Sequence, residues 1–264
     1  MLGRRGPRGR LADYRFQSVR RANCRFATLG RAGRLWAAFR VEQSDPDRFY
    51  RLLADDSVAQ LSMFTPLQGR RLLDVGGGPG YFAREFRAAG ARAVCLDTDS
   101  GELAGLGRPG PGSAIASALR LPLATGAVDV CFSSNVLEHV ADWEAMLAEM
   151  VRVTRPGGLV FVSFTNWLSP WGGHETSPWH YLGGDRAARR YQRRYGRPPK
   201  NRYGTSLFPV SVAAALAWAR AGGGAVLADA VPRYLPGWTR PLLRIPVLRE
   251  FLTWSLLLVL RRTT

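Results

Sequence analysis

The sequence predicts an α/β fold built on a doubly wound, mostly parallel sheet. From residue 70 onward, short apolar runs alternate with amphipathic helical patterns, and glycine-rich turns separate them. Of the 264 residues, 46% are hydrophobic, which is enough to bury a sizeable core in one large domain or two small ones. No period of 20–50 residues recurs, so the chain is not a repeat protein.

The net charge of +17 is distributed unevenly along the chain. Residues 1–40 carry 11 arginines and one acidic residue, and residues 185–202 carry eight basic residues and one acidic residue. Residues 41–184 have a net charge of −5. We expect residues 1–34 to form a basic, disordered arm and residues 35–264 to form one domain. The total charge therefore gives little reason to expect a nucleic-acid-binding protein.

Cysteine usage and apolar segments indicate the compartment. Three scattered cysteines, Cys24, Cys95 and Cys131, exclude a disulfide framework or a zinc cluster and favour a reducing cytoplasm. The longest apolar run, residues 251–260, is half the length of a membrane span, and residues 1–34 lack the apolar core of a signal peptide. Lys200 is the single lysine among the 37 basic residues, and the others are arginines. Such a preference for arginine is typical of proteins from high-GC bacterial genomes. We predict a cytoplasmic bacterial protein without a transmembrane helix.

The individual elements follow from local patterns. Ser44 with an acid three residues later predicts a helix start. An apolar strand at Arg71–Val75 precedes a glycine loop and a helix at 81–89, whose phenylalanines share one face. Further strands are expected at 91–96, 128–133, 159–164, 224–231 and 253–260, and helices around 143–150, at 211–221, at 241–251 and from 185 to about 196.

The glycine loop and the acid at the tip of the second strand predict a cofactor site. Gly76, Gly78 and Gly80 suit a backbone that a ligand approaches closely, because any Cβ would collide with that ligand. The N-terminus of the following helix offers free N–H groups. Asp97 can accept hydrogen bonds from both hydroxyls of a ribose. The site is therefore expected to hold a nucleoside-containing cofactor.

Two cofactors are compatible with this loop. Gly78-x-Gly80-x-x-Ala83 fits the dinucleotide fingerprint of nicotinamide enzymes. Asp74, close before the loop, fits the S-adenosylmethionine pattern better. We therefore favour S-adenosylmethionine, with NAD as the alternative.

Five segments resemble, in order and spacing, the motifs of class I S-adenosylmethionine-dependent methyltransferases. They are LLDVGGGPGYFA (72–83), VCLD (94–97), LRLPL (119–123), VDVCFSSNVLEHV (128–140) and RVTRPGGLVFVS (152–163). Residues 165–184 and 200–211 resemble an actinobacterial subgroup of that family. The resemblance implies a Rossmann-like sheet of seven strands in which the last strand is antiparallel.

The same resemblance implies a set of cofactor-binding residues. They are Asp74, Gly76, Gly78, Gly80, Asp97, Ser117, Ala118 and Asn135. Asp74 would hold the methionine amino group through water, Asp97 would bind the ribose, and Asn135 would line the methionine end. Ser117 stands where the family usually has an acid, which leaves adenine recognition to a hydroxyl or to backbone.

Three histidines follow the cofactor motifs and are candidates for proton transfer. Methyl transfer from a sulfonium is an in-line displacement, so a base is needed only where the acceptor loses a proton. His139 follows the fourth strand, at the edge where α/β sheets bind ligands. We predict that His139, with His174 or His180, is the base. Residues 165–210, with their aromatic loop, are expected to form a substrate-side insertion or lid.

No metal is expected. Glu138-His139 resembles a pair used by some metal-dependent O-methyltransferases, which place another glutamate three residues earlier. This chain has Asn135 at that position, and asparagine is a poor substitute for the charged ligand of a hard cation.

The predicted function is methyl transfer from S-adenosylmethionine to a small, hydroxyl- or acid-bearing acceptor, as O-methylation. One alternative is an RNA methyltransferase that uses the basic segment 185–202, where Tyr191 and Tyr195 lie among arginines. A non-catalytic cofactor-binding protein is another. No RNA-binding module is recognised, so nucleic acid is not an expected partner. The basic segment is expected to be solvated, or to meet an acidic substrate or an anionic membrane. The oligomeric state stays open.

Overall fold

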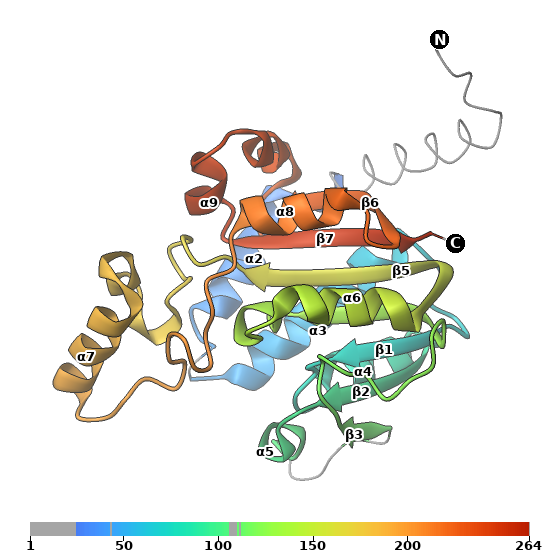
Figure 1. Ribbon diagram of the computed structural model, residues 1–264, viewed down its shortest axis with the longest axis horizontal. Coiled ribbons are helices and arrows are strands. Elements are labelled where there is room, and N and C mark those ends of the chain that lie inside the picture. The colour runs from blue at the N-terminus through green and yellow to red at the C-terminus, as the bar shows by residue number, and fades with distance from the viewer. Residues whose placement is uncertain (1–24, 43, 106–109, 111, 264) are drawn as a thin grey trace.

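A seven-stranded sheet forms the centre of the protein (Figure 1). The computed structural model describes residues 25–42, 44–105, 110 and 112–263. The sheet has the order β3-β2-β1-β4-β5-β7-β6, in which β7 is antiparallel to both neighbours and the other pairs are parallel. The predicted fold class is therefore confirmed. The strands are β1 (Arg71–Val75), β2 (Arg92–Asp97), β3 (Ser113–Ile115), β4 (Val128–Ser134), β5 (Thr154–Thr165), β6 (Ala225–Pro232) and β7 (Ser255–Arg262).

Helices cover both faces of the sheet. The α-helices are α2 (Leu29–Phe39), α3 (Pro46–Ser62), α4 (Tyr81–Ala88), α5 (Ser100–Leu103), α6 (Trp143–Val153), α7 (Gly184–Tyr195), α8 (Val212–Ala221) and α9 (Leu248–Leu252). The 3₁₀ helices are η1 (Leu137–His139), η2 (His174–Thr176), η3 (Trp179–Leu182) and η4 (Gly237–Arg244). Figure 1 shows α6 and α8 in front of the strands and α2 and α3 behind them. Among the described residues, no helix is long and apolar enough to cross a membrane.

The sheet separates two apolar cores. Side chains alternate between the faces of a strand, so Leu73 packs in the core beneath α6 and α8, while Leu72 packs in the core beneath α3 and α4. Cys95 and Cys131 are buried free thiols in these cores, as their strand positions predicted. Because β1, β2 and β4 are parallel, their carboxyl ends meet at one edge, and this edge positions the functional residues.

The expected boundary of the basic arm at residue 34 is wrong. Helix α2 begins at Leu29, and Arg31 within it is buried. The Arg31 guanidinium pairs with Asp56 of α3 at 2.6 Å and donates to the carbonyl of Arg233 at 2.9 Å. Asp56, 25 residues away in the sequence, thus neutralises the charge of Arg31, which was expected to lie in a solvated arm. Residues 1–24, the rest of the predicted arm, lie outside the described residues.

Two other expectations about elements need correction. The single helix expected at 241–251 is divided into η4 and α9. Pro246 explains the division, because it lacks an N–H and disfavours helical backbone at Ile245 before it. Strand β3 was not anticipated; it is a three-residue edge strand with largely exposed side chains, so no apolar alternation marks it.

Asp45, not Ser44, caps helix α3. The Asp45 carboxylate accepts a hydrogen bond from the N–H of Arg48 at 3.1 Å, while the Ser44 hydroxyl donates to the carbonyl of Val41. We expect Asp45→Ala to lower the free energy of unfolding by about 1 kcal/mol, since an N-cap acceptor is lost. Urea denaturation would measure this change. Ser44→Ala is the matched control, and an equal loss in both variants would contradict the assignment of the cap.

Candidate functional site

The carboxyl end of β2 places Asp97 against the glycine loop. One Asp97 carboxylate oxygen accepts the N–H of Gly78 at 2.9 Å, and the other accepts the N–H of Asp99 at 3.0 Å. These bonds fix the carboxylate at the sheet edge. A carboxylate oxygen has more than one acceptor position, so Asp97 can still accept hydrogen bonds from a pair of vicinal hydroxyls.

The glycines of the loop differ in what a Cβ atom at each position would contact. Gly78 and Gly80 have φ values of 50° and 85°, and a Cβ on either would meet no atom within 4 Å. Their bare backbone therefore borders open space, as close approach by a ligand requires. Gly76 differs from the expectation, because its Cβ would collide with the side chain of Val136 rather than with a ligand. Gly77, which the sequence analysis did not select, leaves room for the Asp74 carboxylate.

Asp74 lies beneath this loop and is fully buried. Burial raises the pKa of Asp74 to about 7, against the opposing effect of a hydrogen bond from the backbone of Ala83. One carboxylate oxygen has no hydrogen-bond partner within the described part of the chain. An unpartnered buried oxygen is costly, so it fits the predicted contact with a water or an amino group that a bound cofactor brings.

Ser117 and Ala118 lie beside the strand end that carries Asp97. The residue before them, Ala116, donates its N–H to the Asp97 carbonyl at 2.8 Å. The Ser117 hydroxyl accepts the N–H of Leu119 at 3.2 Å. The structure thus brings the predicted adenine-side residues to the same edge as the predicted ribose acid.

Asn135 follows β4 in the left-handed region, with a φ of 57°, a conformation that asparagine tolerates better than most residues. Its side-chain amide donates to the hydroxyl of Tyr234 at 3.0 Å, and its N–H donates to the carbonyl of Ser163 at 2.8 Å. No local sequence motif marks Tyr234, which is 99 residues away from Asn135 and follows β6.

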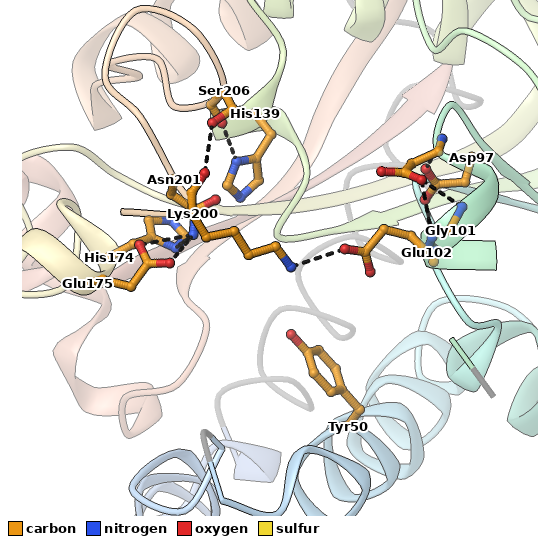
Figure 2. A network of polar contacts seen from close by, with 12 residues as sticks. Tyr50, Asp97, Gly101, Glu102, His139, His174, Glu175, Lys200, Asn201 and Ser206 are labelled. Carbon is orange, nitrogen blue, oxygen red and sulfur yellow. Dashed lines mark hydrogen bonds and ion pairs between the residues drawn. The ribbon is translucent and has the colours of Figure 1, made fainter. Parts of the chain in front are cut away.

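Glu138, His139 and His174 form a polar cluster next to this residue. One ligand-capable atom from each lies within 4.8 Å of the others. The rings of His139 and His174 meet edge to face, with their centroids 5.0 Å apart. Figure 2 shows the two rings close together, beside residues of the segment 200–206. Two of the three predicted catalytic histidines are therefore brought together.

The hydrogen bond of His139 identifies the tautomer of its neutral ring. Its Nδ1 lies 2.7 Å from the carbonyl oxygen of Ser206. A carbonyl oxygen only accepts, so Nδ1 carries a proton and Nε2 of the neutral ring keeps its lone pair. This is the tautomer that a general base needs.

His174 is not suited to act as the general base. Burial, together with the neighbouring His139 and His180, lowers the pKa of His174 to about 3. His174 is therefore neutral at physiological pH and a poor proton acceptor. The amide of Asn201, which donates to both carboxylate oxygens of Glu175 at 3.1 and 3.2 Å, lies 3.5 Å from Nδ1 of His174.

The structure removes His180 from the candidates for the base. Its Nε2 lies 3.1 Å from the carbonyl oxygen of Ser169, and its Nδ1 lies 3.4 Å from the hydroxyl of Ser177. The ring is buried, with 1% of its surface exposed, and it packs against Tyr181. Both nitrogens thus have partners inside the loop, and His180 stabilises that loop.

Glu138, His139 and His174 are also candidate metal ligands by their proximity. The three groups include a carboxylate, but one oxygen of Glu138 accepts the N–H of Thr165 at 3.0 Å. Asn135, where a fourth ligand would stand, is bonded to Tyr234. The Asn201 amide faces Nδ1 of His174 as a donor, which leaves the proton on Nε2, and a protonated nitrogen cannot ligate a metal. The other oxygen of Glu138 and Nε2 of His174 have no hydrogen-bond partner among the described residues. What disfavours a cation is therefore the missing charged ligand at Asn135.

An apolar pocket adjoins the cluster. Its lining residues are mostly aromatic: Ala32, Leu35, Trp36, Phe39, Phe49, Thr165, Trp171, Tyr234 and Trp254. Three contacts join it to the polar residues: Thr165 to Glu138, Tyr234 to Asn135, and the carbonyl of Trp171 to the N–H of His174. The pocket was missed in the sequence because α2, the loop after β5 and the loops flanking β6 and β7 each supply only a few of its walls.

The segment 200–206 crosses the site and connects its two ends. Ser206 contacts His139, and Asn201 lies beside His174. Lys200 reaches the other end, where its ammonium group pairs with Glu102 of α5 at 3.0 Å (Figure 2). Helix α5 follows Asp97 directly in the chain. The segment thus spans the region between the histidine cluster and the predicted ribose acid.

Comparisons with known proteins identify the family of the chain. A family model described as a methyltransferase domain matches residues 73–162. An uncharacterized methyltransferase of Mycolicibacterium gilvum is 53% identical over 247 residues, covering 90% of this chain and 96% of that protein. One from Mycobacterium tuberculosis is also 53% identical over 247 residues, covering 89% and 96%. In fold alone, the chain is similar to an S-adenosylmethionine-dependent methyltransferase from Mesorhizobium loti (TM-score 0.54, 20% identity, 79% of this chain and 98% of that chain).

Proposed function

The chain belongs to the S-adenosylmethionine-dependent methyltransferases, and we propose that it methylates a hydroxyl oxygen of a small acceptor with an apolar body in the cytoplasm. The observation that carries this proposal is the aromatic pocket beside His139, Glu138 and His174. Such a pocket favours apolar ligands, and the polar cluster at its border suits one hydroxyl or acid group. The buried free thiols of Cys95 and Cys131 are compatible with a reducing compartment.

The chain's own residues provide binding and orientation at the cofactor end. S-Adenosylmethionine, when bound, supplies an electrophilic methyl group. Asp97 accepts hydrogen bonds from the ribose, and the bare backbone of Gly78 and Gly80 allows close approach. Asp74 supports the loop from beneath and offers its unpartnered oxygen to the amino-acid end.

The residues at the acceptor end hold and move one proton. Nε2 of His139 accepts the proton of the acceptor hydroxyl, and the Ser206 carbonyl keeps the ring in the required tautomer. His174 stays neutral beside it, so a second positive charge does not oppose protonation of His139. The aromatic walls exclude water, which would otherwise compete for the proton and for the acceptor's position. The reaction in this scheme needs no metal.

A methyl-transfer assay tests this proposal. Purified protein is incubated with S-adenosylmethionine labelled on the methyl group and with matched aromatic alcohols, carboxylic acids and amines, in the presence of EDTA. We expect transfer to the alcohols, unaffected by the chelator. Transfer only to amines, or activity that EDTA abolishes and a divalent cation restores, would contradict hydroxyl methylation by a metal-free site.

The pocket residues give a second expectation for the same assay. Trp36→Ala removes one aromatic wall and should raise KM for the acceptor about tenfold, since apolar burial is lost, while the Kd for S-adenosylhomocysteine stays the same. Trp238→Ala is the matched control, because Trp238 is 74% exposed and does not line the pocket. Equal KM values in the two variants would exclude this pocket as the acceptor site.

A further inference from the structure

Helix α7 carries an unusual concentration of positive charge. It contains five arginines and one aspartate, and Arg197 follows it. We call the exposed arginines of this segment the arginine face: Arg186, Arg189, Arg190, Arg193, Arg194 and Arg197. Within the described part of the chain, none of them forms an ion pair. The helix buries only Gly184 and Ala187, and Figure 1 shows it outside the two helical layers that cover the sheet.

Exposed apolar side chains adjoin the arginine face at η3 and continue on α9. They come from η3 and from α9 with its flanking residue, and we call them the apolar rim: Trp179, Tyr181, Leu182, Val247, Leu248, Phe251 and Leu252. Val247 is 67% exposed and Leu182 is 61% exposed, although both are aliphatic. Burial of such side chains in an apolar phase is favourable, so a cluster of them at the surface indicates an interaction site.

Two contacts connect the arginine face with the apolar rim through η3. The Arg190 guanidinium stacks on the ring of Trp179, 3.8 Å from its centroid. The rings of Tyr181 and Phe251 lie 6.1 Å apart, which connects η3 with α9 across a long stretch of sequence. Arg244, exposed at the end of η4, adds another positive charge on the α9 side.

We propose that this surface docks on an anionic phospholipid membrane. Charge complementarity selects the partner: unpaired arginines attract anionic headgroups, and the adjacent leucine, valine and aromatic side chains enter the boundary between headgroups and acyl chains. Single-stranded RNA would also attract arginines, but its bases need free aromatic faces. Tyr191 and Tyr195 of α7 pack against each other, with centroids 4.6 Å apart. In the apolar rim, Arg190 covers a face of Trp179, and Tyr181 packs near Phe251, so these rings offer fewer free faces to bases.

Vesicle co-sedimentation of the full chain tests the proposal. The probes are vesicles of phosphatidylcholine alone and of phosphatidylcholine mixed with phosphatidylglycerol. We expect binding to the mixed vesicles only. The triple variant Arg186→Gln/Arg189→Gln/Arg193→Gln should lower the partition coefficient at least tenfold, because each arginine near an anionic surface adds to the attraction. Arg190 is retained because it stacks on Trp179.

A charge-matched control separates this surface from the rest of the positive charge. Arg4→Gln/Arg5→Gln/Arg8→Gln removes the same charge from the N-terminal segment and should change binding much less.

The apolar rim is tested with Leu182→Ser/Leu252→Ser. This variant should still bind the mixed vesicles at low salt but should lose the binding that persists at high salt. Absence of binding to mixed vesicles, or equal losses in the two arginine variants, would overturn the proposal. So would arginine-face-dependent binding to single-stranded RNA without vesicle binding. None of these readouts depends on methyl transfer.

Discussion

We expect His139→Ala to lower kcat by about 100-fold or more while the Kd for S-adenosylhomocysteine stays unchanged. A positioned general base contributes roughly 10²- to 10⁴-fold to a rate, and His139 is the histidine whose tautomer leaves a lone pair free. A 100-fold loss corresponds to about 2.7 kcal/mol of activation free energy. Steady-state kinetics with a hydroxyl acceptor and calorimetry with S-adenosylhomocysteine would measure the two quantities.

Chemical rescue distinguishes proton transfer from a structural role of His139. Added imidazole should restore part of the activity of His139→Ala, because it can occupy the vacated space and accept the proton. His174→Ala should reduce kcat less and show no rescue, since His174 is neutral and a poor proton acceptor. Full activity of His139→Ala, or equal rescue of both variants, would remove His139 from this role.

Asp97→Ala should weaken the binding of S-adenosylhomocysteine about 100-fold. The Asp97 carboxylate fixes the N–H of Gly78 and is the predicted acceptor for the ribose hydroxyls. Hydrogen bonds to a charged group contribute roughly 1.5–3 kcal/mol each, so the loss of two is large enough for a change of at least about 100-fold. Calorimetry would measure the Kd, and a parallel titration with NAD should show no binding.

Two further variants test this assignment of Asp97. Asp97→Asn keeps one acceptor oxygen and should lose less affinity than Asp97→Ala. Asp99→Ala is the matched control, because the Asp99 carboxylate caps α5 by accepting the N–H groups of Gly101 and Glu102. Unchanged affinity in Asp97→Ala would exclude Asp97 from the cofactor site.

Local pattern was sufficient to predict most of the sheet and the cofactor edge. Strand β1 occupies the predicted residues 71–75, and Asp97 ends β2 as expected, because an apolar strand, a glycine turn and an amphipathic helix are each encoded by neighbouring residues. The predictions were wrong where a residue distant in the sequence determines whether a side chain is buried. Arg31 resembles part of a charged arm until Asp56 and the Arg233 carbonyl are brought beside it.

The acceptor end was less predictable for the same physical reason. His139 and the Ser206 carbonyl are 67 residues apart, and Lys200 and Glu102 are 98 residues apart. Loop packing brings these groups together, and no periodicity encodes it. Sequence order placed His180 with His174, yet hydrogen bonds inside the loop separate their roles.

Lys200 is the single lysine of the chain, which makes it the one side-chain amine that an acylating reagent can modify. Its hydrogen bond to Glu102 raises the pKa of Lys200, so the reactive neutral amine is scarcer while the two groups are paired. Separation of the segment 200–206 from α5 would lower this pKa and speed acylation. The rate of labelling at Lys200, measured by mass spectrometry without any engineered probe, therefore reports how often the Lys200–Glu102 pair opens.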